Sequence, residues 1–206
     1  MGMILNPYVF KTSPTVAYLT TVGDEVDRSS YTFSSVPFGD ADGGRYIIVG
    51  VAHVTSSVTG VTVDGNSATL AHSSGNLALY IVNLPTGTSG SVVVSMAGTA
   101  ARCAISVYSA KNITSMTPVY DSAADNTDPG NLDCDIPGPS IAIGLGFSNV
   151  STSATWTGLT EDYDGQPFTV TLTTASASLT DAETPRTITC DVASATGFNS
   201  IAAVWQ

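Results

Sequence analysis

Positive charge is scarce in this sequence. Its 206 residues contain 6 Lys and Arg against 17 Asp and Glu, which gives a formal net charge of -11. Nucleic-acid binding requires clustered Lys and Arg that displace counterions from phosphates, and anionic membrane surfaces attract the same residues. The two lysines, Lys11 and Lys111, are far apart in the sequence, and no basic cluster is present. We therefore expect no nucleic-acid partner and no membrane partner, and we interpret the acidity as an aid to solubility.

Cysteine is also rare, with Cys103, Cys134 and Cys190 as the complete set. An odd number of cysteines cannot all pair within one chain, and without a Cys-x-x-Cys motif the usual basis for a zinc site is missing. Cys134 and Cys190 each adjoin an aspartate, whose charge raises the thiol pKa and lowers its nucleophilicity. The sequence leaves open whether Cys134 and Cys190 form a disulfide.

Long apolar runs and helical periodicity are missing as well. No segment approaches the roughly 18 apolar residues that indicate a membrane-spanning helix. Residues 1–14 lack the basic leader and long apolar core of a signal peptide, so we expect synthesis in a cytoplasm without export. Apolar residues are not spaced at intervals of three and four over any long stretch, which argues against a helical fold.

Short segments of alternating apolar and polar residues make up most of the chain, separated by Gly, Pro, Asn and Asp turns. The expected strands are residues 30–37, 45–54, 59–63, 67–71, 77–84, 91–96, 102–109, 140–149, 154–160, 168–174, 186–192 and 199–205. About a dozen short strands at this spacing predict an all-β fold, an antiparallel β-sandwich of the jelly-roll or immunoglobulin-like type. We expect an irregular N-terminal arm over residues 1–28 and a single β-sandwich domain over residues 29–206.

The histidines do not indicate catalysis. His53 lies in an apolar segment and His72 ends another, and no Gly-x-Ser-x-Gly nucleophile elbow accompanies them. Because Ser and Asp are abundant, a Ser-His-Asp set could arise here by coincidence alone. We predict that both histidines are structural and that the protein is not an enzyme.

An acidic and aromatic segment is the candidate glycan-binding site. It contains Trp156, Glu161 and Tyr163. Aromatic rings can stack on a sugar while carboxylates bind its hydroxyls or act as acid and base, so a host polysaccharide is a candidate partner. The alternative is that Trp156 is a core residue and that the acids form the following turn. Such a polar turn would not raise the pKa of a glycosidase acid.

Two acidic loops could hold calcium. Asp40 and Asp42 lie in one loop, and Asp125 and Asp128 lie in the other. Both supply the oxygen ligands that calcium prefers, but neither has the alternating donors and distal Glu of an EF-hand. Since Asp is also an ordinary turn residue, we expect no cofactor and no metal, with calcium as the alternative.

Five stretches carry a resemblance to a known group of proteins: residues 61–70, 77–87, 91–95, 104–108 and 156–161. In these strand and turn patterns the chain resembles β-sandwich proteins encoded by tailed bacteriophages, prophages and related particles, especially of marine and soil alphaproteobacteria. The resemblance covers about residues 30–206. It implies a virion surface component, and it transfers no functional residues because none of its motifs is a catalytic fingerprint.

The N-terminal residues are the candidate docking segment. Their apolar and aromatic members include Ile4, Leu5, Tyr8, Val9 and Phe10. So many are unusual in a solvated terminus, and we expect them to dock on a neighbouring subunit. A terminus that folds back on its own domain, or one that is disordered, is the alternative.

These features together predict a non-enzymatic structural protein at the surface of a phage virion. We expect a capsid-decorating or head-fibre accessory protein that contacts the major capsid protein or a tail protein. A homo-oligomer is expected, with a trimer favoured, because closed symmetric assemblies are common. The alternative is a tail appendage or a carbohydrate-binding module for host attachment.

Overall fold

The fold is built from β-strands. The computed structural model describes residues 12–115 and 120–206, and these residues form 19 strands and no helix. All strand pairs within the sheets are antiparallel, as the register of β3 on both β7 and β9 illustrates. The predicted all-β class with antiparallel sheets is confirmed. Consistent with this, the described part of the chain contains no helix suited to crossing a membrane.

The strands form five sheets, numbered here by their position in the stack. Sheet 1 contains, in spatial order, β2 (Arg28–Pro37), β8 (Ser89–Ala100), β4 (Val58–Val63) and β5 (Asn66–Ser67). Sheet 2 contains β1 (Thr15–Asp24), β9 (Arg102–Lys111), β3 (Arg45–Val54), β7 (Leu77–Asn83) and β6 (Thr69–Ser74). Sheet 3 contains β10 (Asp121–Asp125), β19 (Asn199–Trp205), β13 (Ser140–Ser148), β16 (Thr171–Leu179) and β15 (Thr160–Gly165). Sheet 4 contains β11 (Gly130–Asn131), β18 (Thr189–Val192) and β14 (Ala154–Thr157), and sheet 5 pairs β12 (Cys134–Pro137) with β17 (Ala182–Arg186).

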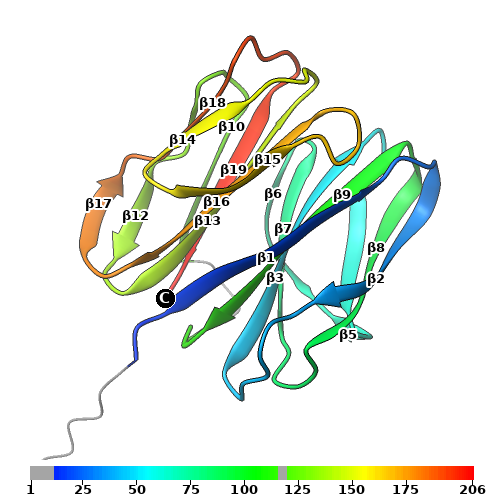
Figure 1. The fold of residues 1–206 in the computed structure, drawn as a ribbon. Coiled ribbons are helices and arrows are strands. Elements are labelled where there is room, and N and C mark those ends of the chain that lie inside the picture. Colours follow the sequence, from blue (N-terminus) through cyan, green and yellow to red (C-terminus); the bar gives the residue numbers. More distant parts are fainter. Residues whose placement is uncertain (1–11, 116–119) are drawn as a thin grey trace, which may run out of the picture.

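These sheets stack in four layers, because sheets 4 and 5 share the last one (Figure 1). The first half of the chain supplies sheets 1 and 2, and the second half supplies the others. A separate apolar cluster fills each of the three gaps between layers. β-sandwich packing therefore occurs in each half of the chain, and the two sandwiches share a seam, the gap between sheets 2 and 3.

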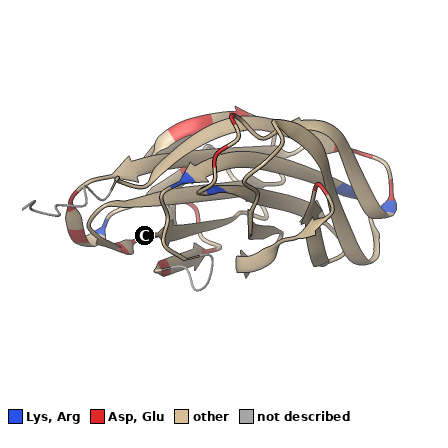
Figure 2. Ribbon diagram, turned by 90° about the horizontal axis from the view of Figure 1, so that it is seen from below, with Lys and Arg blue, Asp and Glu red and all other residues tan. Residues whose placement is uncertain are grey.

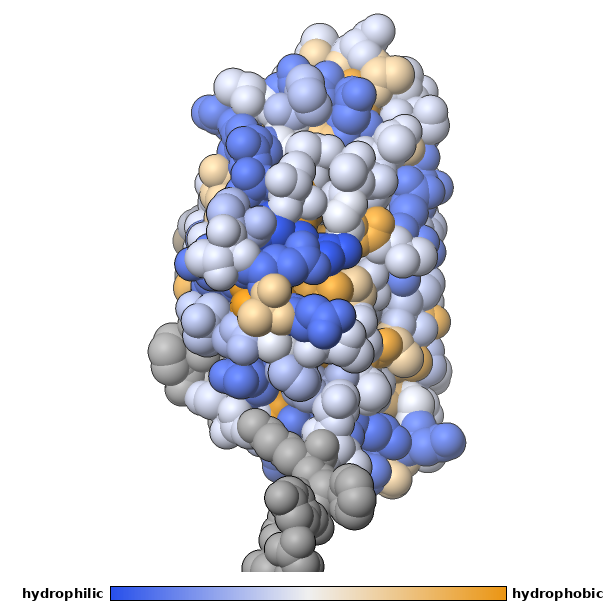
Figure 3. Space-filling model, turned by 90° about the vertical axis from the view of Figure 1, so that its left-hand side faces the viewer, coloured by the Kyte–Doolittle hydropathy of each residue, from blue (hydrophilic) through white to orange (hydrophobic). Residues whose placement is uncertain are grey.

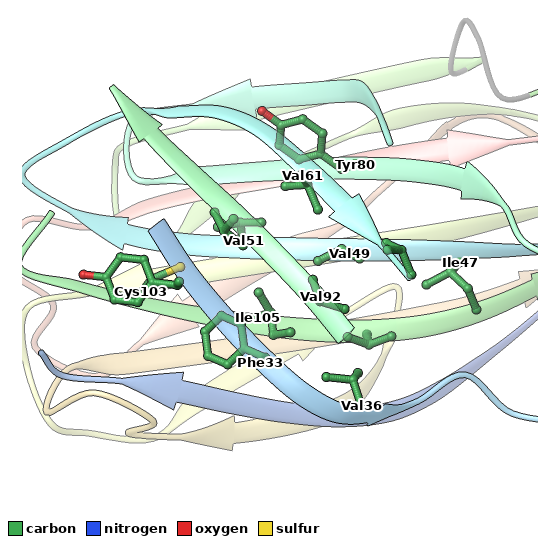
Figure 4. Packing of buried hydrophobic residues seen from close by; sticks show 14 of the residues in the cluster. Phe33, Val36, Ile47, Val49, Val51, Val61, Tyr80, Val92, Cys103 and Ile105 are labelled. Atoms are coloured by element: carbon green, nitrogen blue, oxygen red, sulfur yellow. The ribbon is translucent and has the colours of Figure 1, made fainter. Parts of the chain in front are cut away.

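Sequence pattern decides which sheets lie inside the stack. In β3, Ile47 points into the gap between sheets 1 and 2, which we call the first gap. Its neighbour Ile48 points into the seam, so both faces of the strand are apolar. Strands covered on both faces typically have such continuous apolar runs. In the outer strand β2, by contrast, buried Tyr31 and exposed Thr32 alternate. Figure 4 shows the first gap, filled by side chains from β2, β3, β4, β7, β8 and β9.

The N-terminal boundary differs from the expectation. Residues 15–24, which the sequence places in an irregular arm, form the edge strand β1 and pair with β9. The alternation of β1 is weak because its residues are partly exposed and its register shifts between Tyr18 and Thr20. Its partner is also remote in the sequence, since Thr15 lies opposite Lys111.

The number of strands and layers also exceeds the expectation. Short strands such as β5 and β11 have only two residues each, too few to show alternation. A single sandwich has one polar face on every strand, whereas β13 and β19 are buried at every position. Such strands must be covered on both sides, and this requirement produces four layers in place of two.

A buried arginine fixes the loops at one end of sheets 1 and 2. Arg45 has no exposed surface. Its guanidinium donates hydrogen bonds to the backbone carbonyls of Phe38, Gly39, Leu84, Thr86 and Gly87. One of the few cations of the chain therefore serves the fold, because its donors match five backbone acceptors from two loops.

Candidate functional site

Trp156, the aromatic residue of the predicted glycan site, is buried. Its ring is 9% exposed, and its Nε1 donates a hydrogen bond of 2.8 Å to Thr173 Oγ1. The ring fills space above β13, where Gly144 has no side chain; a Cβ added there would lie 2.6 Å from Trp156 Cζ3. An indole enclosed in this way has no open face for stacking on a sugar. This placement agrees with the alternative interpretation of Trp156 as a core residue.

Glu161 and Tyr163 lie on β15, at the free edge of sheet 3. Glu161 is paired with Ala175, which belongs to the cluster under sheets 4 and 5. Tyr163 is paired with Thr174, on the strand face that looks into the seam. The two side chains therefore belong to opposite faces of sheet 3, and the structure does not unite the three predicted residues in one site.

A β-bulge between Glu161 and Tyr163 turns Asp162 toward the seam. Its carboxylate lies beside the hydroxyls of Ser176 and Tyr108, and partial burial raises the pKa of the Asp162 carboxyl. Asp162 Oδ2 and the Tyr108 hydroxyl are both buried without a well-formed hydrogen bond. Tyr18 covers them with its ring packed edge-on, 5.6 Å from the Tyr108 ring centre. The orientation of Asp162 toward the seam is not predictable from the sequence, because a bulge is a property of pairing rather than of local pattern.

Three of the four calcium candidates carry out turn or ion-pair roles. Asp42 accepts from Gly44 N and lies 3.5 Å from the Lys111 ammonium, while Asp40 is exposed. Asp125 accepts from Thr127 N and Asn131 N, and these bonds lower the pKa of its carboxyl. Asp128 accepts from Val192 N at 3.0 Å. Among residues 12–115 and 120–206, no group of three or more His, Cys, Asp or Glu is placed to hold a metal ion.

The thiols and the His53 imidazole are buried, and the His72 imidazole is half-buried. Cys103, Cys134 and Cys190 are free thiols, so the Cys134–Cys190 disulfide left open by the sequence is not formed. Burial raises the pKa of all three, that of Cys134 to about 12, which keeps them protonated at neutral pH. Burial lowers the pKa of His53 and His72, so both imidazoles are neutral.

A pocket of about 250 Å³ opens at the free edge of the first sandwich, between β4 of sheet 1 and β6 and β7 of sheet 2. We call it the edge pocket, and its hydrogen-bonding groups belong to His53, Ser57, Ser73, Ser74 and Tyr80. Leu70 adds an exposed apolar side chain to its lining. Local sequence pattern does not predict the edge pocket, because its residues come from four strands, β3, β4, β6 and β7, that only the fold brings together. Its one local signal is the run of small polar residues Ser73-Ser74-Gly75-Asn76.

The outer surface is rich in hydroxyls and poor in cations. Figure 2 shows the Lys and Arg residues at separate positions rather than in a patch. The outer face of sheet 4 exposes Thr155, Thr157 and Asp191, and Figure 3 shows intermediate and hydrophilic residues predominating on this side. The predicted docking residues Ile4, Leu5, Tyr8, Val9 and Phe10 lie outside the described residues.

Comparison with known proteins gives little further guidance. No family model matches the chain, and no curated protein matches it. Among solved structures, the crystal structure of the PBSX exported protein XepA is similar over 92% of this chain and 86% of that chain, with 10% sequence identity and a TM-score of 0.29. A similarity at this level supports no inference about fold or function, which must therefore be argued from the chain's own residues.

Proposed function

We propose that the protein is a non-enzymatic structural component of a phage virion, acting as a capsid-decorating or head-fibre accessory protein at the particle surface. The observation that carries the proposal is the four-layer stack with its hydroxyl-rich outer faces. The central strands of the two inner sheets are buried on both faces, and the outer sheets offer Ser and Thr to solvent. The strand and turn patterns that resemble phage β-sandwich proteins support the same role.

Several reactive groups of the chain support a non-enzymatic role, since they have structural duties. Carboxylates bridge distant segments: Asp133 accepts from Ile188 N, and Asp164 accepts from Ala154 N. The thiols are protonated and buried, as described above. Groups that hold loops together in this way are not available as nucleophiles or general acids.

Assembly is assigned to the N-terminal residues. Ile4, Leu5, Tyr8, Val9 and Phe10 give this segment the apolar character of a docking element for a neighbouring subunit, a major capsid protein or a tail protein. A homo-oligomer, with a trimer favoured, would present several such segments at once. Because β1 begins at Thr15, a test of docking has to stop before that residue.

The experiment compares the full chain with a variant lacking residues 1–11, both produced in cells that assemble the particles. We expect antibody labelling of the full chain on particle heads in electron micrographs, and loss of the truncated variant from purified particles. Circular dichroism and urea unfolding should show that the truncated variant keeps its fold.

Three results would contradict parts of the proposal. Label confined to tails would replace the head assignment with a tail appendage. Equal occupancy by the truncated variant would remove the docking role of residues 1–11. Absence of the full chain from all particles would refute the virion role itself.

A further inference from the structure

The edge pocket contains hydrogen-bonding groups that the protein does not use. The hydroxyls of Ser57, Ser73, Ser74 and Tyr80 make no hydrogen bond within the described part of the chain. His53 is 7% exposed, and its buried Nδ1 makes no well-formed hydrogen bond, although the imidazole lies close to the Ser56 backbone. Ser57 and Ser73 are exposed and Ser74 is half-buried, so these hydroxyls are open to solvent and free to bond a ligand.

Neighbouring residues outside the pocket are paired. Ser56, next to Ser57 in the chain, accepts a hydrogen bond from Gly98 N at 2.9 Å. Asn76, at the end of the Ser73–Asn76 turn, donates to the His53 carbonyl at 2.8 Å. The Ser56 hydroxyl and the Asn76 amide are therefore already used within the protein, whereas the hydroxyls of the pocket lining are not.

The pocket has no formal charge. None of its lining residues is Asp, Glu, Lys or Arg. His53 does not add a charge at neutral pH, because burial lowers the pKa of its imidazole. A charged ligand would lose hydration in the pocket without gaining an ion pair, which favours a neutral ligand.

Apolar surface lies beside the hydroxyls. Leu70 is 48% exposed, one of the few large apolar side chains with this exposure in residues 12–115 and 120–206. The register shift between Leu70 and His72 places Leu70 opposite Tyr80, at the margin of the first gap, where Figure 4 shows Tyr80 beside Val61. A ligand with one apolar face and several hydroxyl groups would satisfy both kinds of surface.

The pocket rim is held in place before any ligand binds. Asn199 of β19 donates from Nδ2 to the Ser74 carbonyl at 3.1 Å, and this bond ties the rim to sheet 3. The Asn76 bond to His53 ties the same turn to β3. A preformed rim lowers the entropy lost on binding.

We infer that the edge pocket binds a single neutral sugar residue, such as the end or a branch of a neutral polysaccharide. A sugar ring has C–H groups on one face and hydroxyls around its edge, which match Leu70 and the unpaired hydroxyl and imidazole groups. The volume of about 250 Å³ lies below the roughly 300–1,000 Å³ of pockets for drug-sized ligands, which favours one ring over a longer chain. Only the role of this binding in host attachment rests on the proposed virion function.

The test is an array of neutral and charged glycans probed with the labelled full chain, followed by calorimetric titration of each glycan that binds. We expect binding to one or more neutral glycans. Ser73→Trp, which fills the pocket, should weaken that binding by roughly tenfold or more. Leu70→Ser, at an exposed position that the fold tolerates, should weaken it by a smaller factor. Ser30→Trp, on the exposed face of β2, is the matched control and should bind like the wild type.

The remaining outcomes overturn the inference. These are binding to charged glycans alone, no binding to any glycan, and equal binding by wild type, Ser73→Trp and Leu70→Ser. Trp156→Phe distinguishes the edge pocket from the glycan site predicted from the sequence, and a loss confined to this variant would also overturn the inference. Antibody labelling of particles is a separate measurement, so failure of the virion role and failure of sugar binding are distinguishable.

Discussion

At the scale of single residues, aspartates fall into two groups with opposite effects on stability. Asp125 accepts backbone hydrogen bonds from Asn131 and Thr127, and these lower the pKa of its carboxyl. Asp162 loses hydration in the seam, and this raises the pKa of its carboxyl. The same residue type therefore stabilises the folded state as an anion in one place and as an acid in the other.

The pH dependence of the variant Asp162→Asn follows from this difference. A carboxyl with a raised folded pKa stabilises the protein while protonated, and this contribution is lost as the pH rises above the ordinary value of 3.8. We expect the stability of Asp162→Asn relative to wild type to increase between about pH 4 and pH 7, measured by urea unfolding at each pH. Asp125→Asn is the matched control, and its pH dependence should have the opposite sign. Its free energy of unfolding should fall furthest below that of wild type at neutral pH, and this difference should shrink as the pH falls through the lowered pKa of Asp125. If the free energies of unfolding of Asp162→Asn and wild type change with pH in parallel, Asp162 is not desolvated.

At the scale of strands, two glycines of β13 leave space that side chains of the neighbouring layer fill. Trp156 occupies the space above Gly144, and the Cys190 thiol lies over Gly146, where an added Cβ would be 2.6 Å from Sγ. Gly144→Ala should therefore push β14 away from sheet 3 and lower the free energy of unfolding by about 1–3 kcal/mol. Urea unfolding followed by tryptophan fluorescence measures this loss. Gly43→Ala is the control, because nothing lies within 4 Å of its added Cβ, and equal stability of the two variants would contradict this packing.

The strands also show what a sequence can predict. Residues 45–54, 140–149 and 199–205 are recognisable because long apolar runs belong to strands buried on both faces. β1 is not predictable from local pattern, because its paired residues on β9 lie 79 (Asp24 to Cys103) to 96 (Thr15 to Lys111) positions away and its own residues are mostly half-buried. The edge pocket is not predictable from the sequence for the same physical reason, since His53 and Leu70 come together only through strand register. Local pattern gives the class of the fold, whereas long-range pairing determines its layers and its concave surfaces.

At the scale of the whole molecule, the seam joins two sandwiches that each have a separate outer gap. Its cluster draws side chains from both halves of the chain, among them Leu79 of β7 and Ile143 of β13. Polar contacts cross the same seam, since Val16 N donates to Ser178 Oγ and Asn199 donates to the Ser74 carbonyl. Neither half could bury its seam face alone, so each depends on the other for a complete core.

This mutual dependence predicts a single unfolding transition, although chains longer than about 150 residues often unfold through intermediates. Hydrogen exchange in increasing urea should show β8, in sheet 1, and β18, in sheet 4, losing protection at the same midpoint. Leu79→Ala opens a cavity in the seam and should lower both midpoints together, by about 2–5 kcal/mol in free energy. Val94 lies only in the first gap. Val94→Ala should nevertheless lower both midpoints, because neither half of a cooperative chain unfolds independently of the other. Two separate midpoints, with Val94→Ala moving only that of β8, would show that the halves fold as independent domains and that the seam is only a contact between them.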